Sequence, residues 1–211
     1  MTGKGESGIK VLLRVRPPDP CRATSRCLTR VDDTKAKYLN MKDSASSTFE
    51  FHKVLSESSR QEEAFAAVEE MVDLALDGYD TTVMAYGQTG SGKTHTLLGD
   101  VHDAAQQGII PRAMRRLLEP IEKDAAISSE VTVSMVEIYC ERIRDLLNPT
   151  GNALTLRDGT GAAQLPEATL VRVRSEAQCM ELLARGLLHR SVAATGQHEA
   201  SSRSHCLVSV H

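Results

Sequence analysis

Four short stretches of the chain are strand candidates, and apolar and polar residues alternate along the first two of them. The stretches are Ile9–Arg16, Val131–Tyr139, Thr169–Arg174 and Cys206–His211. In the first of them, one face carries Ile9, Val11, Leu13 and Val15. A period of two over this length is typical of a β-strand with one buried face, so we predict a strand in each stretch. The two prolines after Arg16 end the first strand, because proline has no N–H to donate to a sheet ladder.

Helical spacing is clearest between Ser59 and Gly78. Apolar residues three and four positions apart form one stripe in this segment, made of Phe65, Val68, Val72 and Ala75. Ser59 and Glu62 have the spacing of a capping box at the start of a helix. Gly78 tolerates the left-handed turn that ends many helices, so we predict one helix that stops there.

Two further helices and one buried strand are predicted around the centre and the end of the chain. One helix begins at Pro111, because proline suits the first helical turn. The other runs from Ser175 to about Arg190, and Ser175 and Gln178 have capping-box spacing. The short apolar run Thr81–Gly87 predicts a buried strand.

The remaining segments are polar and favour loops. We expect loops and small edge strands over residues 19–48, and a loop over 151–161 around a short strand, Leu154–Arg157. Strands that alternate with helices indicate a layered α/β domain with a mixed sheet flanked by helices. No linker-like segment divides the chain.

The composition is that of a globular protein without bulk affinity for polyanions. Of the 211 residues, 41% are hydrophobic and 25% are charged, which is enough apolar material for a core. The formal net charge of −3 argues against a nucleic-acid partner or an anionic membrane surface. Because no apolar run approaches membrane-spanning length, we expect no membrane span.

The cysteines and the N-terminus favour a reducing compartment. An odd number of cysteines without CxxC spacing predicts neither a disulfide framework nor a zinc site. The five are Cys21, Cys27, Cys140, Cys179 and Cys206. The opening residues, MTGKGESG, lack the apolar segment of a signal peptide. We therefore expect residues 1–8 to be a disordered tail and the protein to be cytoplasmic.

A glycine-rich stretch carries the most specific chemistry. Residues 87–94, GQTGSGKT, have the G-x-x-x-x-G-K-[ST] spacing of a P-loop and lie between a predicted strand and the start of a helix. Glycines let successive backbone N–H groups curl around a phosphate without Cβ clashes. The helix that follows aims its N-terminal amides at the same anion. The stretch therefore predicts a nucleoside triphosphate site in a P-loop NTPase-type domain.

Each residue of the stretch has an expected part in this site. The phosphate-binding residues would be Gly87, Gln88, Thr89, Gly90, Ser91, Gly92, Lys93 and Thr94. Lys93 would place its charge on the β- and γ-phosphates, and the Thr94 hydroxyl would ligate Mg²⁺. A P-loop by itself does not name an activity, because kinases, GTPases, helicases, transporters and motors share it.

A second polar cluster, SSRSH, occupies residues 201–205 directly before the last predicted strand. Taken alone, a serine-rich loop explains it adequately. The functional alternative is a loop that senses the γ-phosphate, in which hydroxyls complete the magnesium shell and reach the terminal phosphate.

Together, these motifs resemble the motor domain of kinesins. AYGQTGSGKTHT precedes SSRSH, and RVRP at residues 14–17 resembles the family's adenine-side motif. GIIPRA resembles the segment after the P-loop helix, and VEIYCERIRDLL resembles a family strand and helix. The order and spacing match from about Ile9 to His211. The resemblance implies a cytoskeletal microtubule motor that binds ATP and Mg²⁺, hydrolyses ATP, and dimerises through regions outside this chain.

The resemblance also implies roles for individual residues. Arg14, Arg16 and Pro17 would border the adenine, and His95 would stack near it. Ser201 and Ser202 would form the first switch, with Ser202 on Mg²⁺ or the γ-phosphate, and Arg203 would pair with a glutamate of a second switch. With Lys93 and Thr94, these three residues are the expected catalytic group. Without the resemblance, Arg14 and Arg16 read as exposed strand residues, His95 as a polar helix residue and Arg203 as a surface arginine.

Departures from the family pattern leave the activity open. His198 replaces the asparagine of N-x-x-SSRSH, Cys140 replaces that of EIYNE, and His52 replaces an aspartate. No D-x-x-G-x-E second switch is present, so residues 9–211 are expected to form a partial motor domain, incomplete at its C-terminal end. Two alternatives are a truncated or non-catalytic module that binds nucleotide or tubulin, and an unrelated P-loop NTPase such as a small-molecule kinase.

Overall fold

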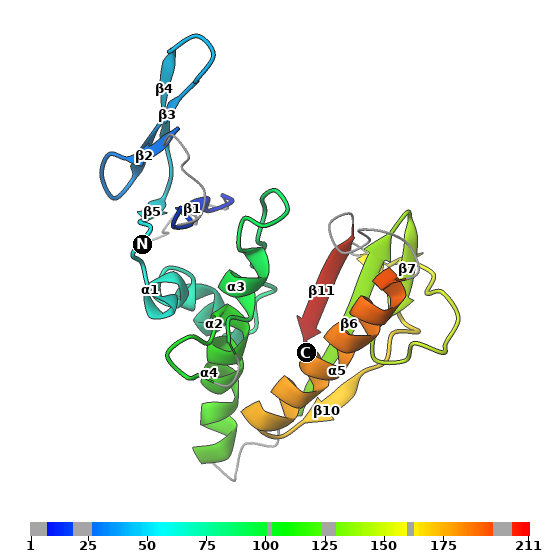
Figure 1. Cartoon of the computed structure of the whole chain (residues 1–211). Coiled ribbons are helices and arrows are strands. Elements are labelled where there is room, and N and C mark those ends of the chain that lie inside the picture. The colour runs from blue at the N-terminus through cyan, green and yellow to red at the C-terminus, as the bar shows by residue number, and fades with distance from the viewer. Residues whose placement is uncertain (1–7, 19–26, 101–102, 124–129, 160–162, 196–203) are drawn as a thin grey trace. The chain divides into compact units, whose positions relative to one another are not determined.

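A computed structural model describes residues 8–18, 27–100, 103–123, 130–159, 163–195 and 204–211 (Figure 1). The chain divides into two compact units, Met1–Ile110 and Pro111–His211. Both units combine β-strands with helices, as the alternating patterns predict for an α/β protein. In the part of the chain that the structure describes, the strands lie in parallel and antiparallel pairs, distributed over four small sheets.

Two of these sheets belong to the first unit. In one, β1 (Leu12–Arg14) pairs in parallel with β5 (Lys53–Leu55). In the other, β2 (Leu28–Arg30), β3 (Lys35–Leu39) and β4 (Ser46–Glu50) form an antiparallel sheet in that order. The segment expected to hold loops and small strands therefore forms an antiparallel sheet over its second half.

The strand predicted over Ile9–Arg16 is shorter in the structure. Ile9 is 89% exposed and Val11 is 49% exposed, whereas Leu13 and Val15 are half-buried. Within the described residues, β1 is hydrogen-bonded to β5 alone, over three residue pairs. The prediction of a buried face at Ile9 and Val11 was wrong because alternation indicates a strand but does not supply the layer that covers it.

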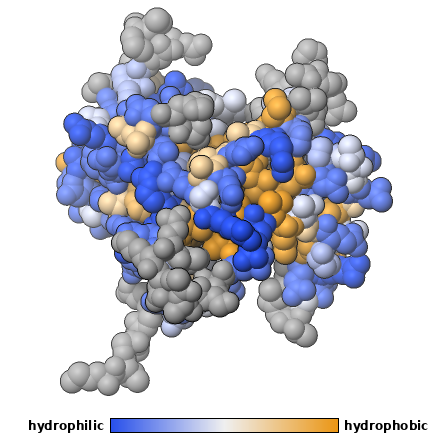
Figure 2. All heavy atoms as spheres, turned by 90° about the horizontal axis from the view of Figure 1, so that it is seen from below, coloured by the Kyte–Doolittle hydropathy of each residue, from blue (hydrophilic) through white to orange (hydrophobic). Residues whose placement is uncertain are grey.

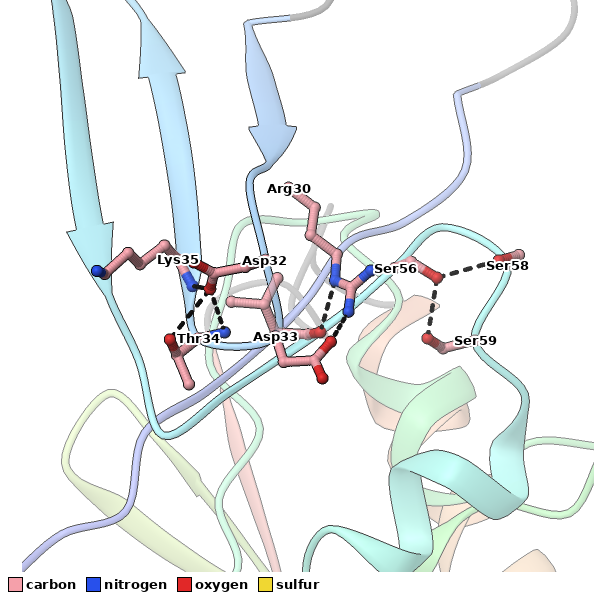
Figure 3. Close-up of polar contacts among 9 residues, drawn as sticks. Arg30, Asp32, Asp33, Thr34, Lys35, Ser56, Ser58 and Ser59 are labelled. Carbon is pink, nitrogen blue, oxygen red and sulfur yellow. Dashed lines mark hydrogen bonds and ion pairs between the residues drawn. The ribbon is translucent and has the colours of Figure 1, made fainter.

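Polar side chains stabilise the turn between β2 and β3 and connect it to β5 by hydrogen bonds (Figure 3). Asp32 Oδ1 accepts the backbone N–H of Thr34 (2.7 Å), and this bond lowers the pKa of Asp32. Arg30 pairs with Asp33, and its Nε donates to the Val54 carbonyl (3.2 Å). The β2–β3 turn is therefore attached to the strand that leads into the helices.

The helix predicted between Ser59 and Gly78 is divided into α1 (Gln61–Ala66) and α2 (Glu69–Leu76). Its start is one residue later than predicted, because Arg60 is the N-cap and its N–H donates to Glu63 Oε1 (3.0 Å). Ser59 does not cap it, since its hydroxyl contacts Ser56 Oγ (3.2 Å; Figure 3). The apolar stripe is confirmed, with Val68 and Val72 buried and Phe65 and Ala75 half-buried. Gly78 follows α2 with a φ of +90°, as expected for a helix stop.

The second unit is built around β6 (Val131–Tyr139), which lies between β10 (Val171–Val173) and β11 (His205–Val210) and also pairs with β7 (Arg142–Asp145). All of these pairs are antiparallel. The strands predicted at β6, β10 and β11 are confirmed. The short strand expected around residues 154–157 is a bridge at Leu154 followed by β8 (Arg157–Asp158), which pairs with β9 (Ala163–Gln164).

Two longer helices, α4 and α5, follow the P-loop helix and β10 in the chain. α4 (Ile109–Lys123) begins two residues before Pro111, and α5 (Glu176–Thr195) lies along the β6 sheet (Figure 1). A Cβ on Gly186 of α5 would lie 2.3 Å from Met135 Sδ of β6, so any other residue there would have to displace the buried Met135 side chain. Ser175 Oγ accepts the N–H of Gln178 (3.2 Å), which confirms the predicted start of α5.

Two further sequence predictions were wrong. The segment after β6 forms no helix, because Cys140 and Glu141 both have positive φ (+48° and +62°) and turn the chain back into β7. Two consecutive positive φ values are typical of a type I′ hairpin turn. The segment Thr81–Gly87 is not a strand and is not buried, since Met84 and Tyr86 are 81% and 94% exposed. No strand in the described part of the chain is paired with it.

Each unit buries its own apolar residues. The buried set includes Val54, Leu55, Ala64 and Leu98 in the first unit, and Val133, Met135, Leu182 and Leu183 in the second. Burial raises the pKa of the Cys179 thiol to about 11, as expected for an unreactive buried cysteine. Hydrophobic residues also reach the face drawn in Figure 2, among hydrophilic ones. No helix in the described ranges is both long and apolar enough to cross a membrane.

Candidate functional site

The glycine-rich stretch forms a tight loop that leads into α3 (Lys93–Leu97). Gly90 and Gly92 have φ values of +78° and +100°, in the region that side chains other than glycine rarely adopt. A Cβ on Gly87 would lie 2.6 Å from Ser91 Oγ. The backbone path therefore favours glycine at positions 90 and 92, and Gly92 is the N-cap of α3.

Lys93 bends back over the loop that precedes it. Its ammonium group donates to the carbonyl oxygens of Gly87 and Gln88, both at 2.8 Å. Two of its three N–H bonds are directed at the start of the loop, so the charge is held at the loop rather than in solvent. Thr94, the next residue of α3, has an exposed side chain. The Lys93 ammonium group and the Thr94 hydroxyl are thus neighbours in sequence at the C-terminal end of the glycine-rich loop.

The first arginine of RVRP is part of a half-buried hydrogen-bond network. Arg14 Nη1 donates to Gln61 Oε1 (2.9 Å) and to Thr96 Oγ1 of α3 (3.1 Å), and Nη2 donates to the Ser59 carbonyl (3.4 Å). Burial lowers the pKa of Arg14, while the charge of Glu63 raises it. Arg14 is therefore not an ordinary exposed strand residue, because its guanidinium joins β1 to α1 and α3.

The second arginine reaches the loop directly. Arg16 is exposed, and its Nη1 donates to the Gly90 carbonyl. Pro17, the next residue, is also exposed. Arg14 thus contacts α3 and Arg16 contacts the loop before it, and the role of both arginines beside an adenine stays a prediction.

His95 lies on α3 within the positive field of both arginines. Burial lowers its pKa, and the charges of Arg14 and Arg16 lower it further. The imidazole is therefore expected to be neutral at neutral pH. A neutral ring suits stacking against a base better than an imidazolium would, because no second positive charge has to be desolvated.

We expect the lowered pKa of His95 to make the stability of the protein decrease in mild acid. Below the usual histidine pKa of 6.5, the unfolded chain binds a proton that the folded state resists, so the free energy of unfolding falls as the pH drops. His95→Gln removes this titration. Between about pH 7.5 and about pH 5.5, the variant should lose about 1 to 2 °C less in Tm than the wild type. The effect is small because the ring is partly solvated, and equal pH slopes would contradict it.

The serine cluster lies mostly outside the described residues. Ser201, Ser202 and Arg203, together with His198, are not described, so their expected roles stay predictions. Ser204 is described and half-buried. Arg190 Nη2 of α5 donates to its hydroxyl (2.9 Å) and its carbonyl (3.3 Å), and Arg190 Nε donates to Glu137 Oε1 of β6 (3.0 Å). Ser204, the fourth residue of the cluster, is therefore bonded to α5 through Arg190, which also bonds Glu137 of β6.

Sequence reasoning missed Gln61. This residue is 2% exposed and contacts Arg14 and His95, two residues that the motifs did identify. It belongs to no short motif, and the predicted helix start at Ser59 placed it among ordinary polar residues of the first turn. Only its burial and its partners single it out.

Comparisons with known proteins agree with the motifs. The family model described as Kinesin motor domain matches residues 14–211. The kinesin-like protein KIN-UB of Arabidopsis thaliana is 36% identical over 213 aligned positions, which cover 96% of this chain and 23% of that protein. KIN-UB of Oryza sativa subsp. japonica is 38% identical over 214 positions, which cover 97% and 24%.

A solved structure shares the fold. It is described as "Structure of a fast kinesin: Implications for ATPase mechanism and interactions with microtubules", and it matches with a TM-score of 0.89 and 33% identity over 96% of this chain and 58% of that chain. The likeness confirms the fold class predicted from the sequence. The chain spans about a quarter of the length of the two curated relatives described above.

Proposed function

This chain belongs to the kinesin motor domain family, and from this premise we propose that it binds ATP with Mg²⁺ at the loop 87–94 and couples ATP hydrolysis to movement along microtubules. The observation that carries the proposal is the conformation of the loop. Two glycines with positive φ lead into α3, and the Lys93 ammonium is held over the carbonyls of Gly87 and Gln88.

The residues of the loop fit a triphosphate. A backbone without Cβ atoms at Gly90 and Gly92 leaves room for an anion to approach the main chain. Lys93 would offer its remaining N–H to the phosphates, and the exposed Thr94 hydroxyl would hold Mg²⁺. When bound, Mg²⁺ neutralises negative charge on the phosphate oxygens. Catalysis would then consist mainly of positioning and of stabilising charge.

The other proposed site residues act around the base and the γ-phosphate. Arg16 and Pro17 would border the base, and the neutral ring of His95 would stack near it. Support for this placement comes from the contact of Arg16 with the Gly90 carbonyl. The first switch is proposed at Ser201, Ser202 and Arg203, with Ser202 as a second ligand of Mg²⁺, and the attachment of Ser204 to Arg190 would hold its C-terminal end.

Microtubules are the proposed partner, and the microtubule cytoskeleton of the cytoplasm is the proposed location. The solved relative, a fast kinesin, is described as interacting with microtubules. Any dimerisation is assigned to regions outside this chain. Because the chain spans only part of the length of its relatives, these proposals concern the whole protein of which this domain is a part.

The proposal is tested by measuring ATP binding and turnover. We expect the purified protein to bind ATP only when Mg²⁺ is present, to co-sediment with microtubules, and to turn ATP over faster when microtubules are added. Nucleotide and microtubule binding without turnover would favour the non-catalytic module. Absence of Mg²⁺-dependent affinity for any nucleoside triphosphate would overturn the assignment.

A further inference from the structure

Gln61 is a buried polar residue that connects three elements of the first unit. It is the first residue of α1 and is 2% exposed. Its Oε1 accepts from Arg14 of β1 (2.9 Å). Its Nε2 donates to the His95 carbonyl of α3 (2.7 Å) and to the Gln106 carbonyl (3.2 Å). A buried amide with partners at both ends fixes the distances between the elements that supply them.

The partners determine the chemistry that this position needs. A guanidinium can only donate, so the end of the side chain that meets Arg14 has to be an acceptor. Carbonyl oxygens can only accept, so the other end has to be a donor. Glutamine satisfies both requirements. Glutamate would satisfy Arg14 but would turn an oxygen toward two carbonyl groups, and methionine would satisfy neither end.

The contacts lie on one side of the proposed nucleotide site. Arg14 belongs to the RVRP segment whose Arg16 contacts the loop at Gly90, and His95 is the residue proposed to stack near the base. The bonds of Lys93 go to Gly87 and Gln88, within the loop itself. The bonds of the Lys93 ammonium therefore do not involve Gln61, whereas Arg14 of RVRP and the His95 carbonyl are bonded to it directly.

A second set of contacts supports the same arrangement. Arg14 Nη2 donates to the carbonyl of Ser59 (3.4 Å), two residues before Gln61. The Ser56 hydroxyl contacts the hydroxyls of Ser58 (3.0 Å) and Ser59 (3.2 Å), so the turn before α1 is itself ordered (Figure 3). The start of α1 is thus positioned by Arg14 and by the three serines of the turn that precedes the helix.

We propose that Gln61 is a positioning residue for the nucleotide base: its amide holds Arg14 of β1 against α3 and thereby sets the width of the base-binding side. The inference rests on the proposed function, because it assumes a nucleotide at this loop. It predicts that removing the amide weakens binding of the whole nucleotide far more than binding of its phosphate chain.

The test compares ATP with inorganic tripolyphosphate, each with Mg²⁺, by calorimetry or by displacement of a fluorescent ATP analogue. The variants are Gln61→Met and Gln61→Glu. In both, we expect the Kd for ATP to rise about tenfold or more, and the Kd for tripolyphosphate to stay within about twofold of the wild type. The readout is the ratio of the two constants, which a general loss of structure would leave unchanged.

Gln178→Met is the matched control. Gln178 also lies in the first turn of a helix, α5, and accepts a backbone N–H, that of Arg174 (2.8 Å), but it belongs to the second unit. We expect this variant to bind both ligands as the wild type does.

Other outcomes contradict the inference. Equal weakening of ATP and tripolyphosphate binding, or failure of both Gln61 variants to fold, would mean that Gln61 serves only the fold. Wild-type ATP affinity in Gln61→Glu would mean that Gln61 serves only as an acceptor for Arg14. If the wild type binds neither ligand, the proposed function and the inference both fail. If the wild type binds both ligands but the Gln61 variants leave the ratio of the two Kd values unchanged, only the inference fails.

Discussion

Replacing Lys93 by alanine is expected to reduce Mg²⁺-dependent ATP turnover by at least about a hundredfold. Lys93 is the one cation that the loop 87–94 itself provides. Its ammonium is already oriented by the carbonyls of Gly87 and Gln88, at 2.8 Å each. A charge that is fixed before the substrate binds stabilises developing negative charge without a reorganisation cost, so its loss should affect turnover more than any surface lysine would.

The measurement is steady-state phosphate release in the presence of microtubules, together with ATP binding. Lys37→Ala is the matched control, because Lys37 is exposed on β3, in the same unit and outside the loop. The control should keep its turnover, and both variants should melt close to the wild type. If Lys93→Ala turned ATP over at the wild-type rate, the assignment of the loop as a phosphate site would be wrong.

Replacing Arg190 by methionine is expected to lower the free energy of unfolding by about 3 to 5 kcal/mol. Arg190 and Glu137 form an ion pair at 3.0 Å, with side chains only 18% and 5% exposed. The substitution leaves the Glu137 carboxylate buried without its partner. Removing one member of a buried pair is costly, because the remaining charge has lost its solvation and gained nothing in exchange.

Urea unfolding of three variants separates this effect from ordinary loss of an ion pair. Arg157→Met breaks the exposed pair with Glu167, whose side chains are 63% and 51% exposed, and should cost no more than about 1 kcal/mol. The double variant Arg190→Met with Glu137→Leu removes both charges and should recover part of the lost stability. A loss in Arg190→Met no larger than in Arg157→Met would refute the buried-pair interpretation.

Short-range patterns account for the part of the candidate site that the sequence predicted. The spacing from Gly87 to Thr94 requires only eight consecutive residues, and the positive φ values of Gly90 and Gly92 follow from local sterics. Likewise, the strand candidates Val131–Tyr139 and Cys206–His211 predicted β6 and β11 closely. These features depend on neighbours within one element, which the sequence displays directly.

Predictions that depended on distant partners were less successful. Thr81–Gly87 has strand-like residues but forms no strand, because a strand requires a hydrogen-bonded neighbour and no described strand provides one. The helix start at Ser59 moved to Arg60 because the hydroxyl of Ser59 contacts Ser56. The turn at Cys140 and Glu141 was read as the approach to a helix, whereas pairing of β7 with β6 selects a hairpin.

The sequence by itself determined several strands and helices, where the glycine loop lies and which cation it carries, since these follow from residue types a few positions apart. The tertiary structure decided the partners. Arg14 and Gln61 are 47 positions apart, Gln61 and His95 are 34 apart, and Glu137 and Arg190 are 53 apart. Burial gives these polar groups their importance, because a hydrogen bond or charge removed from water must find its partner inside the fold. No pattern of neighbouring residues predicts which residue the partner of a buried polar group will be.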